Sequence, residues 1–141
     1  MSEDWQDVNR QVVEEFRAND GVVGGRFTGM PMVLVTHTGA KSGIRRTAPL
    51  VCSRDGDRVV IIASKGGAPT NPDWYHNMVA NPSVTVELPG ADTFEATVHE
   101  AEGDERERLF AAQVAIMPFF ADYQAGTERT IPVLVLTRSA S

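Results

Sequence analysis

The 141-residue chain has 19 acidic and 13 basic residues, a net charge of −6, and a hydrophobic content of 42%. This size suits a single domain, 1–141, with its own core. The acidic balance argues against nucleic-acid binding, and no apolar run approaches the roughly 18 residues of a membrane span. Cys52 is the single cysteine and the first residues lack the basic-then-apolar order of a secretory signal, so we expect no intrachain disulfide and a cytoplasmic location.

The first twenty residues predict an amphipathic helix. Trp5, Val8, Val12 and Phe16 recur at helical spacing, and Asp20-Gly21 supplies a stop. Acidic residues dominate the polar face. We therefore expect this helix to pack on the domain, and the acidic face counts against peripheral association with an anionic membrane.

Three strands are predicted next, at 32–37, 46–53 and 58–63, because these runs are rich in β-branched and other apolar residues. HTGAKSGIRR (37–46) connects the first two. The Asp55-Gly56 pair favours a tight hairpin between the second and third.

The remaining chain predicts a short helix, two paired strands, a longer helix and a closing strand. Asn71 is placed as the N-cap of the short helix, with Pro72 at its first position. Strands at 83–88 and 93–101 follow, the second with clear alternation of polar and apolar residues. Asp104 and Glu107 have capping-box spacing, which predicts a helix at 104–116. Residues 131–137 are predicted to form the last strand, which is buried.

About six short strands with hairpin turns and peripheral helices predict a mainly β (α+β) domain, folded as a closed or partly closed antiparallel barrel. A barrel of this size has little internal space. We therefore expect a ligand on its outside or at a subunit junction, the latter in a homodimer.

Several chemistries are excluded by the residues present. GAKS matches only part of a phosphate-binding loop, since Val35 and Ala40 stand where that motif needs glycine. No GxGxxG follows a strand into a helix. The three histidines are widely separated and there is one cysteine, so we expect no metal site and see no nucleophile and base pair. This pattern fits a protein whose chemistry comes from a bound cofactor.

The basic turn predicts an anion site. Residues 21–54 hold five basic residues and no acid, so the rest of the chain carries −11. Lys41, Arg45 and Arg46 lie within six positions of one another. Thr38, Ser42 and the backbone amides near Gly39 and Gly43 add hydrogen-bond donors for a phosphate or carboxylates. Solvated surface charges are the simpler reading, but the absence of neighbouring acids favours a small anionic ligand.

A second glycine-rich loop follows the third strand, at Ser64, Lys65, Gly66 and Gly67. Paired glycines permit a flat ring to approach the backbone, although such a pair is also typical of an ordinary turn.

Ordered motifs over residues 32–136 resemble the deazaflavin-dependent nitroreductase family. They include T-x-T-G-x-K-S-G (36–43), R-x-x-P-L (46–50), A-S-K-G-G-A-P (63–69), P-x-W-Y-x-N (72–77), A-D-Y-Q (121–124) and R-T-I-P-V (129–133). Relatives are split β-barrels, a fold that also hosts FMN, and they bind coenzyme F-420, a 5-deazaflavin with a phosphate and an oligoglutamate tail. The resemblance implies a split antiparallel barrel of the FMN-binding type.

The resemblance also implies the cofactor site. Lys41 and Arg46, helped by Ser42, Arg45 and Thr38, would hold the phosphate and tail, and Thr47 and Pro49 are further expected cofactor-binding residues. Ser64, Lys65, Gly66 and Gly67 would lie along the ring, and Trp74 and Asn77 would brace it.

The function implied is that of an oxidoreductase. Reduced coenzyme F-420 would pass hydride to a small electron-poor acceptor, such as an unsaturated lactone, a furanocoumarin, a quinone or a nitroaromatic compound. Tyr123, Ser64 or water would supply the proton. Met117 and Phe120 stand where nitroimidazole-reducing relatives place tyrosines, so we expect a more apolar acceptor pocket and doubt that drug class as a substrate.

Two alternatives are kept open. An FMN-dependent split-barrel reductase would leave part of the basic cluster unexplained, because FMN has a phosphate but no glutamates. A non-catalytic carrier of a deazaflavin or acyl ligand would bind without turnover.

Overall fold

The computed structural model describes residues 5–19, 21, 31–64, 71–90 and 92–139, with side chains from residue 10 onward. Within these ranges the helices are α1 (Trp5–Ala18), α2 (Asp73–Ala80), α3 (Gly103–Ile116) and α4 (Phe119–Ala125). The strands are β1 (Met32–Thr38), β2 (Arg45–Asp55), β3 (Arg58–Ile62), β4 (Ser83–Leu88), β5 (Asp92–Glu100) and β6 (Val133–Arg138).

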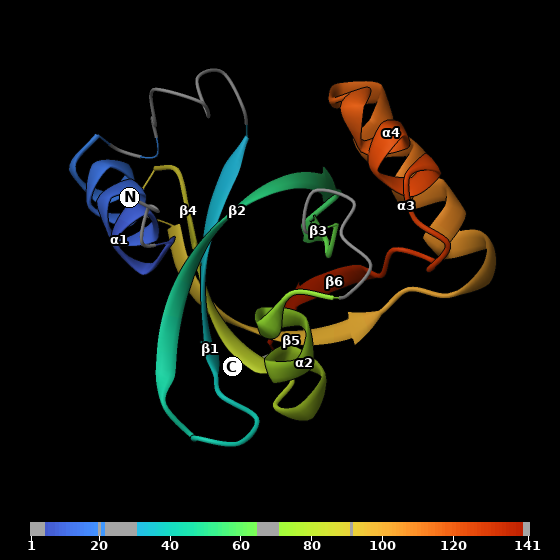
Figure 1. Cartoon of the computed structure of the whole chain (residues 1–141). Coiled ribbons are helices and arrows are strands. Elements are labelled where there is room, and N and C mark those ends of the chain that lie inside the picture. Colours follow the sequence, from blue (N-terminus) through green and yellow to red (C-terminus); the bar gives the residue numbers. More distant parts are fainter. Residues whose placement is uncertain (1–4, 20, 22–30, 65–70, 91, 140–141) are drawn as a thin grey trace, which may run out of the picture.

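The strands close into an antiparallel barrel in the order β1-β2-β3-β6-β5-β4, with β4 pairing back onto β1 (Figure 1). The predicted antiparallel barrel is confirmed. Its interior is filled by apolar side chains, among them Val33, Val59, Val86 and Leu134, all fully buried. Because side chains fill the barrel, a ligand must bind outside it.

The helices cover different parts of the barrel. Val12, Val13 and Phe16 of α1 pack on the outer side of β1, which confirms the expected packing of the first helix. Met78 of α2 joins the interior cluster at one end of the barrel. On the other side, α3 and α4 cover the outer faces of β3 and β6 (Figure 1).

Strand composition follows from these layers. In β5, Phe94, Ala96 and Val98 are buried while the residues between them face solvent, as the alternation predicts. In β3 and β6 both faces are buried, one in the interior cluster and one beneath α3 and α4. This explains why VVII and VLVL are unbroken apolar runs.

Two predicted helix starts are wrong. The N-cap of α2 is Pro72, and Asn71 instead accepts a hydrogen bond from Arg129 at 2.7 Å. The N-cap of α3 is Glu102, without a side-chain cap bond, so Asp104 and Glu107 form no capping box. Helix α4 was not predicted.

Strand β2 changes partner along its length. Residues 45–51 pair with β1, and residues 52–55 pair with β3. Among the described residues, the first part of β2 therefore has a paired strand on one side only. This open edge lies beside the site described next.

Candidate functional site

The basic turn between β1 and β2 is held by its own hydrogen bonds. The Gly39 amide donates to the Ile44 carbonyl at 2.9 Å, and the Gly43 amide donates to the Gly39 carbonyl at 3.1 Å. The Ile44 amide donates to Ser42 Oγ at 3.1 Å. Gly43 has a φ of 71°, a conformation that favours glycine.

These bonds correct one expectation. The amides of Gly39 and Gly43 were expected to be open for an anion, but both donate within the turn. These two amides are therefore not available to an anion. Ser42 can still help, because its hydroxyl hydrogen is not used when Oγ accepts a bond.

Helix α2 anchors the turn through Asn77. Its Oδ1 accepts from the Ala40 amide at 2.9 Å, and its Nδ2 lies 3.2 Å from His37 Nδ1. Burial, with the nearby Arg46 charge as a smaller cause, lowers the pKa of His37. His37 is therefore neutral at pH 7, and its Nδ1 accepts a hydrogen bond from the Asn77 amide group.

Two adjoining cavities form a groove over this region. One, of about 690 Å³, is lined by the basic turn and α2, including Lys41, Ser42, His76 and Asn77. The other, of about 740 Å³, extends to α1 and includes Arg10, Val13, Thr47 and Trp74. His37, Arg46 and Asp73 line both cavities, so the two adjoin.

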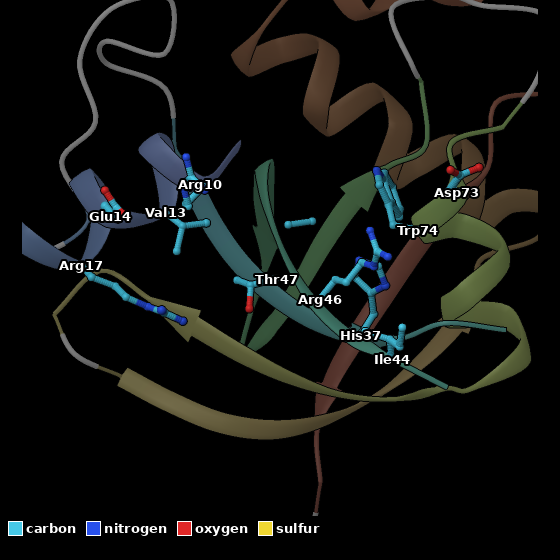
Figure 2. A pocket seen from close by; sticks show the side chains of 11 residues that line it. Arg10, Val13, Glu14, Arg17, His37, Ile44, Arg46, Thr47, Asp73 and Trp74 are labelled. Carbon is cyan, nitrogen blue, oxygen red and sulfur yellow. The ribbon is translucent and has the colours of Figure 1, made fainter. Parts of the chain in front are cut away.

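Figure 2 shows how the elements surround the second cavity. Arg10, Glu14 and Arg17 come from α1, Asp73 and Trp74 come from α2, and Arg46 and Thr47 lie on β2 between them. Arg46, Thr47 and Ala48 are consecutive, yet all three line the same cavity. This arrangement indicates that the groove runs along the open edge of β2, because both faces of a strand are accessible only at an edge.

The two neighbouring arginines diverge. Arg46 lines the groove, whereas Arg45 Nη2 donates to Thr85 Oγ1 on β4 at 2.9 Å. The hydrogen bond to Thr85 directs the Arg45 side chain toward β4. The predicted cluster of Lys41, Arg45 and Arg46 is thus divided, and Arg45 lies away from the groove.

The other predicted site residues are placed as follows. Thr38 contributes its carbonyl to a 3.3 Å bond from Asn81, and Pro49 pairs opposite Leu34; neither lines a described cavity. Lys65, Gly66 and Gly67 lie outside the described residues. Ser64 is 8% exposed, and its carbonyl accepts from Arg129 at 2.7 Å.

Aromatic residues of α4 form a packed group. Tyr123 is half-buried, and its ring lies 5.5 Å from Phe119 and 5.4 Å from Phe120. Met117 and Phe120 are each 5% exposed and belong to the cluster beneath α3 and α4. None of the four lines the groove, so their predicted influence on the acceptor stays a prediction.

Sequence reasoning missed several groove residues: Arg10, Glu14 and Arg17 on α1, and His37, Ile44 and Asp73 near the turn. Arg17 also binds Glu87 on β4, at 2.7 and 3.0 Å. The sequence placed the charged residues of α1 on the polar face of the helix and assigned them no ligand. Nothing local in the sequence shows that this helix packs beside β2.

The groove offers binding chemistry more than catalysis. Lys41, Arg46 and Ser42 can donate hydrogen bonds to an anion, and Val13, Ile44, Ala48 and Trp74 provide apolar surface. Within the described part of the chain, no group of three metal-ligating side chains gathers, and no helix is long and apolar enough to cross a membrane. The arrangement fits an acidic, partly planar ligand.

Comparison with known proteins agrees with this geometry. Residues 8–138 match the family described as F420H(2)-dependent quinone reductase. An F420H(2)-dependent quinone reductase of Mycobacterium tuberculosis is 39% identical over 127 residues, which are 87% of this chain and 85% of the relative.

Two solved structures are also similar. An F420-H2 dependent reductase, FDR-A, is 42% identical with a TM-score of 0.70, over 75% of this chain and 93% of that one. A domain-swapped dimer is 37% identical with a TM-score of 0.72, over 94% of this chain and 99% of that one.

Proposed function

Because the chain belongs to the F420H(2)-dependent quinone reductase family, we propose that it reduces quinones with hydride taken from reduced coenzyme F-420. The observation that carries this proposal is the groove formed by two adjoining cavities, both of which are lined by Arg46. The groove lies outside a filled barrel, where a flat cofactor with an acidic tail has room to bind.

The residues of the groove fit the cofactor's chemistry. A phosphate and several carboxylates require cationic and hydroxyl donors, and Lys41, Arg46 and Ser42 supply them at one end. A flat ring requires apolar surface, which Trp74, Ile44 and Ala48 supply farther along. We propose that Asn77 contributes by fixing the turn against α2, through its bonds to Ala40 and His37.

The binding free energy required indicates that both the tail and the ring of the coenzyme contribute to affinity. Micromolar affinity requires about −8 kcal/mol. Three charge-assisted hydrogen bonds contribute roughly 4 to 9 kcal/mol in total, before the cost of association is subtracted. Tail contacts alone are therefore insufficient, and burial of the ring against residues such as Trp74 must add to them.

When bound, reduced coenzyme F-420 supplies the hydride. The chain's own residues orient the coenzyme and the acceptor, and a proton must then reach the reduced acceptor. Hydride addition to a quinone leaves an oxyanion that needs one proton to become the hydroquinone. We keep Tyr123, Ser64 and water as the candidate donors. Activated alkenes and nitroaromatics remain further acceptor classes in this proposal, because they too accept hydride at an electron-poor centre.

The test is an acceptor screen with purified protein and reduced coenzyme F-420. Oxidation of the coenzyme, followed by absorbance, should depend on both protein and quinone. Parallel titrations with coenzyme F-420 and FMN should show tighter binding of the former. Tight coenzyme binding without turnover on any quinone, enone or nitro compound would favour a carrier, and tighter FMN binding would favour the flavin alternative.

We also propose a homodimer in the cytoplasm. A relative 37% identical to this chain is a domain-swapped dimer, which supports the homodimer. Buried Cys52, whose pKa is raised to about 11 by desolvation, is a reduced thiol compatible with that compartment. Light scattering and cell fractionation test the two statements separately.

A further inference from the structure

A polar network links the end of β3, the start of α2 and the segment between α4 and β6. At its centre is Arg129. Its Nη1 donates to the Ala63 carbonyl at 3.2 Å and to Asn71 Oδ1 at 2.7 Å, and its Nη2 donates to the Ser64 carbonyl at 2.7 Å. One guanidinium therefore joins two chain segments that flank the second glycine-rich loop.

The position of Arg129 is itself fixed from α4. Gln124 Nε2 donates to the Arg129 carbonyl at 2.8 Å, and Gln124 Oε1 accepts from the Ile131 amide at 3.0 Å. The same Oε1 accepts from Nη2 of buried Arg106 at 2.8 Å, and that nitrogen also donates to the Ile131 carbonyl at 2.9 Å. The segment is thus held at its backbone at Arg129 and at Ile131.

The network includes one candidate proton donor, Ser64, and a residue adjacent to the other candidate side chain, Tyr123. Ser64 is bound directly through its carbonyl, and Tyr123 precedes Gln124 on α4. Asn71 lies two residues before α2, which carries Trp74 and Asn77 of the groove. A shorter side chain at position 129 could not reach three acceptors on two segments at once, and lysine lacks the planar fork of donors.

Resting on the reductase function proposed above, we propose that Arg129 is a positioning residue, which sets Ser64 and the start of α2 relative to each other for coenzyme binding and hydride transfer. It acts through the groups that it holds and need not touch the coenzyme. Its guanidinium stays protonated even though partial burial lowers its pKa, so the three bonds persist across the working pH range.

The first test needs no cofactor. Hydrogen exchange by NMR should show faster exchange in Arg129→Gln at the Ala63 amide, which donates to Pro132, and at the α2 amides. Arg108→Gln is the matched control, because Arg108 binds Asp55 at 3.0 and 3.3 Å in another part of the molecule. Exchange at these amides equal to that of the control would overturn the proposal, whatever the protein's activity.

The second test uses the loaded protein. Arg129→Gln should weaken coenzyme F-420 binding and lower kcat, each at least tenfold, with the quinone KM changed less than threefold, and Arg129→Lys should recover part of both losses. Asn71→Ala removes one acceptor only, so it should give a smaller loss in the same direction even if Arg129→Gln fails to fold. Wild-type affinity and kcat in Arg129→Gln, with a lowered Tm alone, would mean a purely structural role. Inactivity of the wild-type protein would instead count against the proposed function, and the exchange result would still decide the role of Arg129.

Discussion

Asn77 on α2 and His37 at the end of β1 are joined by a 3.2 Å contact between Nδ2 and Nδ1, although they are forty residues apart in the chain. Through this pair, the helix at the barrel end is attached to the strand that leads into the basic turn. The pair therefore connects the shape of the groove to the protonation state of a buried histidine.

The first prediction concerns pH and stability. Because the pKa of His37 is lowered from 6.5 in the folded protein, mainly by desolvation, the unfolded chain takes up a proton that the folded chain rejects. The free energy of unfolding should fall as pH drops below 6.5 toward the lowered pKa, by at most about 1.4 kcal/mol per pH unit from this group. His37→Gln should reduce that slope.

Urea unfolding at a series of pH values measures this effect. His76→Gln, at an exposed position of α2, is the matched control for the loss of a histidine side chain. Identical slopes in His37→Gln and wild type would show that His37 titrates alike in both states.

The second prediction compares two glycines with positive φ, one in the basic turn and one in the β2–β3 hairpin, to separate an effect on coenzyme binding from the general loss of stability. Gly43 and Gly56 have φ of 71° and 61°, and an added Cβ at either position meets nothing within 4 Å. Alanine at each should cost about 1 kcal/mol of stability, because a left-handed conformation disfavours a side chain. Only Gly43→Ala should also weaken coenzyme binding, several-fold, since Gly43 shapes the basic turn.

Denaturation and coenzyme titration of both variants supply the comparison. Equal coenzyme affinities in the two proteins would mean that the turn's conformation does not matter for binding.

The third prediction concerns the β2–β3 hairpin. Asp55 accepts from Arg108 and Arg58, and these bonds lower its pKa from 3.8 to about 2. The charged form is favoured in the folded state, so its contribution is present above 3.8 and is lost as pH falls toward about 2. Asp55→Asn should reduce stability by about 1 kcal/mol at pH 7, a value kept small because the pair is partly solvated.

The difference between wild type and Asp55→Asn should shrink in unfolding experiments as pH falls through this range. Coenzyme affinity should be unchanged, because Asp55 does not line the groove. A difference that stays constant down to pH 2 would argue against these ion pairs as its source.

Much of the barrel could be predicted because strands and hairpin turns leave recognisable patterns in neighbouring residues of the sequence. Alternation in 93–99 identifies one buried face, and Asp55-Gly56 marks a hairpin. Helix α4 was missed because seven residues, mostly aromatic or small, give too short a periodic signal after Pro118. Asn71 was misread as a cap because its partner, Arg129, lies 58 residues away.

The site was predicted in part for the same reason. The charge of the basic turn is visible in the sequence, but the bond that directs Arg45 to Thr85 on β4 depends on tertiary packing. The α1 side of the groove and the His37–Asn77 contact depend on tertiary packing, which no local pattern reports. Positions 65–67 lie outside the described residues, so their predicted role stays a prediction.

The central claim is that the basic turn binds the acidic tail of the coenzyme, and comparing two adjacent arginines tests it most directly. Coenzyme F-420 affinity should be measured over a range of salt concentrations for wild type, Arg46→Ala, Lys41→Ala and Arg45→Ala. We expect losses above about 2 kcal/mol, roughly thirtyfold, and a flatter salt dependence for the first two variants. Arg45→Ala should stay within about threefold of wild type, because Arg45 binds Thr85. Equal effects of Arg45→Ala and Arg46→Ala, or no effect of either, would contradict the account.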